Sequence, residues 1–119
     1  AVSYDLYFWR FEDESAPPTS ARETCDILCD GGAPEGLAAL AVEDVKSAIA
    51  EVMGQAGWSQ DGVFWERSGV IAEIYVEDRH VQVSLRGKWT GDDANRLIDV
   101  MNGFGCPLYD AQTGERFQV

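Results

Sequence analysis

The 119-residue sequence has no long apolar run and only three cysteines. No stretch reaches the roughly 18 to 20 apolar residues that a membrane-spanning helix needs, so we expect no membrane protein. The first residues are aromatic and acidic, not basic and then apolar, so no signal peptide is expected. An odd, small set of cysteines does not fit the disulfide framework of a secreted domain. We therefore predict a cytoplasmic protein with reduced thiols.

Motifs that carry catalytic chemistry are also missing. The sequence has no Gly-x-Ser-x-Gly and no paired histidines, and Gly31-Gly32 lacks the lysine and spacing of a phosphate-binding loop. The single histidine, His80, falls at a predicted hairpin turn among charged residues, where histidines are usually solvated. We therefore predict a protein that is not an enzyme and binds no cofactor. The alternative is a small enzyme or ligand-binding domain with a pocket between its sheet and its helices.

A metal site would have to combine Cys25 and Cys29, four residues apart, with His80 and Cys106. This spacing is loose and contains no Cys-x-x-Cys pair. Cys25 and Cys29 also fit the apolar stripe of their predicted helix, where a free cysteine packs as a small hydrophobic residue. We therefore expect no metal.

Basic residues are scarce. Nine lysines and arginines face 21 aspartates and glutamates, which gives a formal net charge of −12. This charge repels phosphate backbones and anionic membranes, and the bases form no stripe, so neither nucleic acid nor a membrane is an expected partner. A basic protein would be attracted. The plain alternative is that the acidic residues serve only solubility.

The sequence does contain a clear order of helix and strand patterns. We predict a strand at residues 4–11, helices at about 20–30 and 43–54, strands at 63–67, 70–76 and 81–87, a helix from Thr90, and strands at 107–110 and 115–119. The order β-α-α-β-β-β-α-β predicts a single α+β domain over residues 1–119. We expect a two-layer sandwich with the helices on one face of a mainly antiparallel sheet. This order is close to a ferredoxin-like fold with an added strand in the middle.

The three central strands predict their own register. A tight turn at residues 68–69 pairs Trp65 with Ala72, and a turn at 77–80 pairs Ile74 with Val83. Apolar residues then fill one face and a mixed set fills the other, as in an antiparallel sheet with one buried face. The mixed set is Phe64, Glu66, Ile71, Glu73, Tyr75, Gln82, Ser84 and Arg86.

The first strand is apolar on both faces. Tyr4, Leu6 and Phe8 fit the helix-packed core, whereas the alternate residues would join the open face of the sheet. Either residues 12–18 or 116–119 of the chain cover those alternate residues, or a partner does. In the second case aromatic anchors ringed by carboxylates would bind a basic protein, or a second copy of the chain. The predicted partner-binding residues are Tyr7, Trp9, Phe11, Glu12, Asp13, Glu14, Glu66, Glu73 and Tyr75.

Two segments carry a resemblance. SYDLYFWRF at residues 3–11 and GCPLYDAQTGE at residues 105–115, in an acidic chain, resemble small acidic bacterial proteins that are similar to immunity proteins of polymorphic and contact-dependent toxin systems. The resemblance implies a cytosolic inhibitor that binds a toxin domain and occludes it. Such families share no catalytic residues, so none is carried over. Toxin domains that attack nucleic acid are often basic, and an acidic inhibitor suits them by charge.

Overall fold

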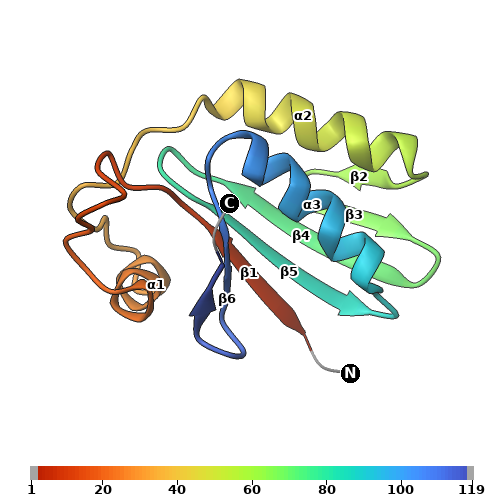
Figure 1. Cartoon of the computed structure of the whole chain (residues 1–119). Coiled ribbons are helices and arrows are strands. Elements are labelled where there is room, and N and C mark those ends of the chain that lie inside the picture. The colour runs from red at the N-terminus through yellow and green to blue at the C-terminus, as the bar shows by residue number, and fades with distance from the viewer. Residues whose placement is uncertain (1–2, 118–119) are drawn as a thin grey trace.

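The computed structural model describes residues 3–117 and shows one sheet with helices on both sides (Figure 1). Among these residues no helix is long and apolar enough to cross a membrane. The elements, in chain order, are β1 (Tyr4–Phe8), α1 (Ala21–Cys29), α2 (Val42–Gln55), β2 (Ser59–Asp61), β3 (Phe64–Arg67), β4 (Val70–Val76), β5 (Val81–Gly87), α3 (Gly91–Gly103), β6 (Leu108–Asp110) and β7 (Glu115–Arg116).

The sheet is antiparallel, with the strand order β2-β3-β4-β5-β1-β6-β7. Its centre, β4-β5-β1-β6, has the split β-α-β arrangement of a ferredoxin-like fold: β5 lies between β1 and β4, and β1 lies between β5 and β6. The predicted α+β sandwich is confirmed. The sequence predicts one added strand, at residues 63–67, and this strand is β3. The structure adds a second one, β2, which pairs with β3 at the sheet edge, so the addition is a hairpin.

The predicted register of the central strands is confirmed. Trp65 pairs with Ala72, and Ile74 pairs with Val83. The turn between β3 and β4 places Ser68 at φ 48° and Gly69 at φ 85°. A two-residue hairpin turn with both residues in the left-handed region matches the twist of its strands, which fixes the pairing that follows. Every side chain of β3, β4 and β5 is thereby assigned to one face of the sheet.

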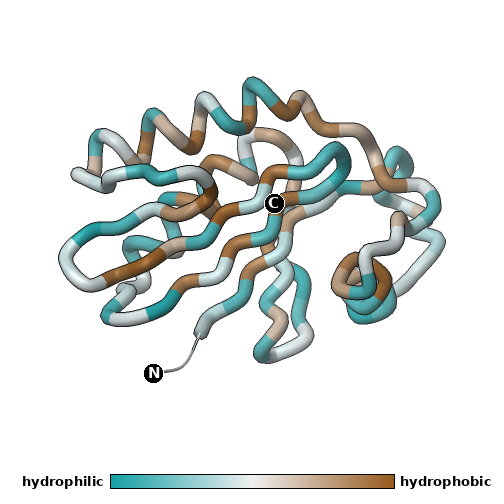
Figure 2. The backbone as a smooth tube through the Cα atoms, turned by 180° about the vertical axis from the view of Figure 1, so that it is seen from behind, coloured by the Kyte–Doolittle hydropathy of each residue, from teal (hydrophilic) through white to brown (hydrophobic). Residues whose placement is uncertain are grey.

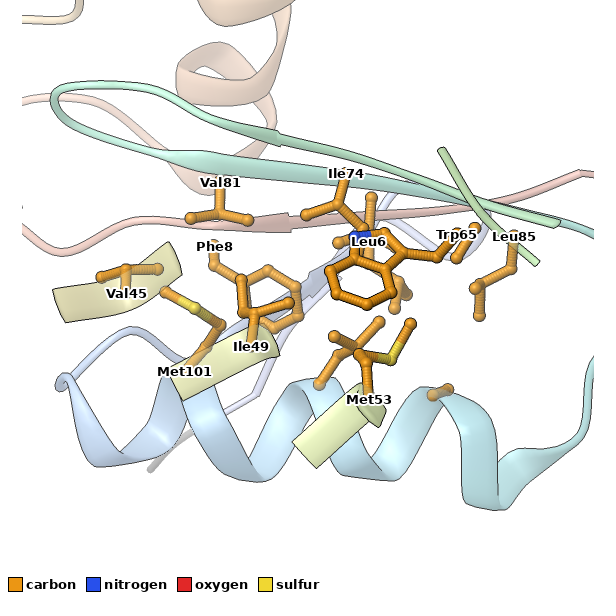
Figure 3. Packing of buried hydrophobic residues seen from close by; sticks show 14 of the residues in the cluster. Leu6, Phe8, Val45, Ile49, Met53, Trp65, Ile74, Val81, Leu85 and Met101 are labelled. Carbon is orange, nitrogen blue, oxygen red and sulfur yellow. The ribbon is translucent and has the colours of Figure 1, made fainter. Parts of the chain in front are cut away.

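The main core lies between the sheet and the helices α2 and α3 (Figure 3). Leu6 and Phe8 of β1 pack there with side chains of both helices, among them Val45, Ile49 and Met101. The helix α3 begins at a capping box, in which Thr90 and Asp93 each accept a hydrogen bond from the other's backbone N–H. These two helices lie on the single face that the sequence predicts.

The helix α1 lies on the opposite face, so the prediction that all helices share one face is wrong for this element. Its start is as predicted, because the Ser20 Oγ accepts a hydrogen bond from the Glu23 N–H at 3.2 Å. Its buried Cys25 and Leu28 pack against Tyr7 and Trp9 of the first strand segment, not against the main core. A second, smaller core therefore forms under α1 at one end of the sheet.

Candidate functional site

The second core covers the aromatic residues that the sequence leaves unexplained. Tyr7, Trp9 and Phe11 are only 6%, 0% and 3% exposed, because α1, Leu37 and Tyr109 enclose them. Their predicted role as surface anchors for a partner is therefore wrong. A ring that the chain itself buries has no face left to offer another protein. The cover is α1, which the sequence predicts on the other side of the sheet.

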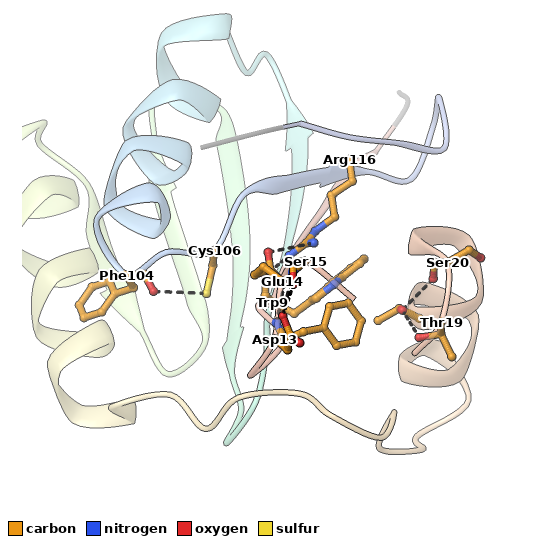
Figure 4. Close-up of polar contacts among 11 residues, drawn as sticks. Trp9, Asp13, Glu14, Ser15, Thr19, Ser20, Phe104, Cys106 and Arg116 are labelled. Carbon is orange, nitrogen blue, oxygen red and sulfur yellow. Dashed lines mark hydrogen bonds and ion pairs between the residues drawn. The ribbon is translucent and has the colours of Figure 1, made fainter. Parts of the chain in front are cut away.

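Arg116 closes the same core from the C-terminal side (Figure 4). Its guanidinium lies 5.1 Å from the centre of the Trp9 ring and donates a hydrogen bond to the Trp9 carbonyl at 2.6 Å. It also forms an ion pair with Glu14 at 3.2 Å. Burial of the guanidinium lowers the pKa of Arg116, and Glu14 opposes that shift. The predicted cover by the C-terminal segment is thus confirmed for Arg116, whereas residues 118–119 lie outside the described residues.

The acidic loop, which includes Glu12, Asp13 and Glu14, uses two of these carboxylates in contacts within the chain. The Glu14 carboxylate accepts a hydrogen bond from the Phe11 N–H at 2.7 Å, in addition to its pair with Arg116. Asp13 accepts hydrogen bonds from the Ser15 backbone and side chain, which lower the pKa of the Asp13 carboxyl. Glu12 is exposed. Asp13 and Glu14 therefore have structural roles in the loop, and steering of a partner by Glu12, Asp13 or Glu14 stays a prediction.

In the part of the chain that the structure describes, no helix covers the rest of the sheet face beside α1 (Figure 2). On this face Phe64 is 46% exposed and Ile71 is 38% exposed. They are diagonal neighbours on β3 and β4, because Phe64 pairs with Glu73 and Ile71 pairs with Glu66. We call this surface the open face. Its residues are Asp5, Ser59, Asp61, Phe64, Glu66, Ile71, Glu73, Tyr75, Gln82, Ser84 and Arg86.

The charge of the open face is negative. Within this set Arg86 is the base, and it forms an ion pair with Glu73. The Tyr75 hydroxyl donates a hydrogen bond to the same carboxylate, which raises the pKa of Tyr75. Glu73 is therefore engaged by its neighbours, whereas Glu66 is exposed beside Ile71. Of the predicted residues, Glu66, Glu73 and Tyr75 do share one surface, and their part in binding a partner stays a prediction.

The residues considered for a metal site are not brought together. The Sγ atoms of Cys25 and Cys29 lie 3.8 Å apart under α1, whereas Cys106 belongs to the main core and His80 to the β4-β5 hairpin. Among residues 3–117 no group of three or more His, Cys, Asp or Glu side chains could hold a metal ion. A groove of about 530 Å³ lies between α2 and the β2-β3 hairpin, and neither His80 nor Cys106 lines it. His80 does line a second cleft, of about 610 Å³, together with Glu77 and Asp78.

The three cysteines are expected to differ in reactivity. Burial raises the pKa of Cys25 to about 12 and that of Cys106 to about 11, so both thiols stay protonated at pH 8. Cys29 is exposed. Iodoacetamide treatment of the native protein at pH 8, followed by mass spectrometry of the digested chain, should modify Cys29 first. Modification of Cys25 at the same rate would show that α1 leaves the sheet on the time scale of the reaction.

A comparison with protein-family profiles and with curated protein sequences finds no match for the chain. The likeness to immunity proteins therefore stays a prediction.

Proposed function

We propose that the protein is a protein-binding module whose open face docks a basic protein. One observation carries the proposal: Phe64 and Ile71 are exposed side by side on a face that also holds Asp5, Asp61 and Glu66. A contiguous exposed apolar patch is typical of a binding surface, and a few side chains at its centre supply most of the affinity when a partner buries them. Surrounding carboxylates favour a partner of opposite charge and speed its association.

The narrower form of the proposal is an immunity protein that neutralises a basic toxin domain by occlusion. The resemblance of residues 3–11 and 105–115 supports it, and so does the formal net charge of −12. An inhibitor that acts by covering its target needs no catalytic group of its own. It would act in the cytoplasm, where free thiols such as Cys29 stay reduced.

A second copy of the chain is the competing occupant of the open face. A symmetric dimer through this face would place the same patch against itself, and its carboxylates would meet carboxylates. This repulsion between like charges disfavours the homodimer, whereas the same carboxylates attract a basic partner. The experiment therefore has to distinguish a homodimer from a complex with a basic partner.

The test compares two charge reversals. The protein, carrying an affinity tag, is used to capture partners from lysate, and the captured proteins are identified and purified for kinetic measurement. Glu66→Lys, on the open face, is expected to slow association with a basic partner about tenfold at low salt and to reduce the salt dependence of the rate. Glu51→Lys makes the same charge change on the exposed surface of α2, and we expect it to change the rate by less than about twofold.

Two results would overturn the proposal. Equal effects of Glu66→Lys and Glu51→Lys on a basic partner would mean that net charge, not the open face, governs binding. A homodimer in light scattering that is lost in Phe64→Ser would mean that the face pairs with its own copy. For the narrower proposal, co-expression with the captured toxin should restore growth with the unaltered protein, and less well with the Glu66→Lys variant.

A further inference from the structure

A cleft of about 610 Å³ borders the open face, between the end of α1 and the β4-β5 hairpin. Leu28 and the segment from Gly31 to Leu37 form one wall, and Tyr75, Gln82 and the hairpin turn form the other. Because Tyr75 lines the cleft and also belongs to the open face, the two surfaces are continuous. A partner seated on the open face would therefore reach this cleft.

The walls of the cleft are tied together by hydrogen bonds. The Arg79 guanidinium donates to the Leu37 carbonyl at 2.6 Å, and the Leu40 N–H donates to the Asp78 carbonyl at 2.8 Å. At the end of α1 the chain turns so tightly that a Cβ on Gly32 would lie 2.8 Å from the Ile27 side chain. The cleft is therefore held in shape by contacts on both sides.

The lining combines apolar, aromatic and acidic groups. Ala33 is exposed and adds apolar surface to the cleft beside the largely buried Leu28 and Leu37, and the Tyr75 ring stands at its border with the open face. Glu77 and Asp78 bring negative charge from the hairpin turn, against the single positive charge of Arg79. His80 is half-buried, and this burial lowers its pKa, so its imidazole is neutral at pH 7. The cleft thus keeps a net negative charge.

We propose that this cleft receives an arginine side chain of the basic partner. The inference rests on the proposed function. The three methylene groups of arginine can lie against the apolar wall of the cleft, where Ala33 is the exposed residue. Its planar guanidinium can stack on the Tyr75 ring and bond a carboxylate of Glu77 or Asp78 with two parallel hydrogen bonds. Arginine is also among the residues that contribute most to protein interfaces.

Other occupants fit this lining less well. A phosphate or a carboxylate would be repelled by Glu77 and Asp78. An apolar side chain would take those carboxylates out of water without giving them a partner. A lysine carries the charge, but it lacks the flat group that stacks on an aromatic ring and pairs with a carboxylate through two bonds.

The probe is N-acetyl-arginine amide, and the control ligand is N-acetyl-citrulline amide, which has the same shape without the charge. In two-dimensional NMR spectra of the ¹⁵N-labelled protein, the arginine compound should cause saturable shifts at the amides of Gly31, Gly32, His80 and Gln82. The citrulline compound should bind at least about tenfold more weakly, because it cannot pair with Glu77 or Asp78. The double variant Glu77→Gln with Asp78→Asn should lose the saturable shifts. The double variant Asp61→Asn with Glu66→Gln, which removes two charges outside the cleft, should keep them.

Three results would overturn the inference: no saturable shift with the arginine compound, equal binding of the citrulline compound, or tighter binding of N-acetyl-lysine amide. The test is independent of the partner. If the arginine compound fails while Glu66→Lys still impairs capture of a basic protein, the cleft assignment falls and the proposed function stands. If the arginine compound binds as expected but no basic protein docks on the open face, the proposed function falls and the arginine-binding cleft remains.

Discussion

The substitution Trp9→Ala should lower the free energy of unfolding by about 3–5 kcal/mol, the usual cost of removing a buried large aromatic side chain. Trp9 is fully buried in the second core, where its ring packs 5.3 Å from that of Tyr109 and lies under the Arg116 guanidinium. Truncation would leave a cavity and also remove the surface on which Arg116 rests. Urea denaturation followed by far-ultraviolet circular dichroism measures the change.

Phe64→Ala is the matched control, because it removes an aromatic side chain from the exposed side of the same sheet. Phe64 is nearly half exposed, so we expect a change below about 1 kcal/mol. The two variants separate a ring that the fold needs from a ring that is available to a partner. If Trp9→Ala were as stable as the unaltered protein but no longer bound its partner, Trp9 would belong to the binding surface. That result would contradict the account of the second core.

The second large effect is expected for Asp93→Ala, which should cost about 2–4 kcal/mol, because a buried carboxylate with several partners is removed. Asp93 accepts hydrogen bonds from Arg67 at 2.7 Å and from the Thr90 N–H at 2.8 Å. Arg67 also donates to the Ala56 carbonyl at 3.1 Å and stacks on Trp58. One carboxylate thus joins the end of β3, the end of α2 and the start of α3.

Asp92→Ala is the control for this second prediction. Asp92 lies in the same first turn of α3 but is exposed, so its loss should cost no more than about 1 kcal/mol through the helix dipole. The comparison is again made by urea denaturation. Equal effects of the two substitutions would mean that the helix dipole, and not the contact with Arg67, accounts for the stability contributed by Asp93.

The register of the central sheet could be predicted because its signals are local. Apolar and polar residues alternate along β4 and β5, and Ser68-Gly69 permits only a tight turn between β3 and β4. A shift of one residue would expose Ala72 and Ile74 and bury Glu73. For the same reason Glu66, Glu73 and Tyr75 could be placed on one surface from the sequence.

The position of α1 could not be predicted in the same way. Its stripe of Cys25 and Leu28 fits either face of a sheet, and glycine- and proline-containing loops leave the helix free to lie on either side. The aromatic residues of β1 were the available signal, because a second apolar face on a strand needs a cover and α1 was the helix that could supply it. The strand β2, with the sequence Ser-Gln-Asp, is paired through its backbone and has no apolar pattern to reveal it.

The central position of β1 also bears on how the chain reaches its fold. Its neighbours in the sheet are β5 and β6, so Leu6 pairs with Val83 on one side and with Asp110 on the other. During synthesis β1, the most aromatic strand, therefore leaves the ribosome well before β5 and β6, and both of its edges stay unpaired until those strands follow. Such long sequence separations slow folding, and an unpaired apolar strand is prone to aggregate in the meantime. The acidic residues that follow β1, from Glu12 to Glu14, place negative charge beside that strand while it is unpaired. Charge next to an apolar strand opposes its aggregation.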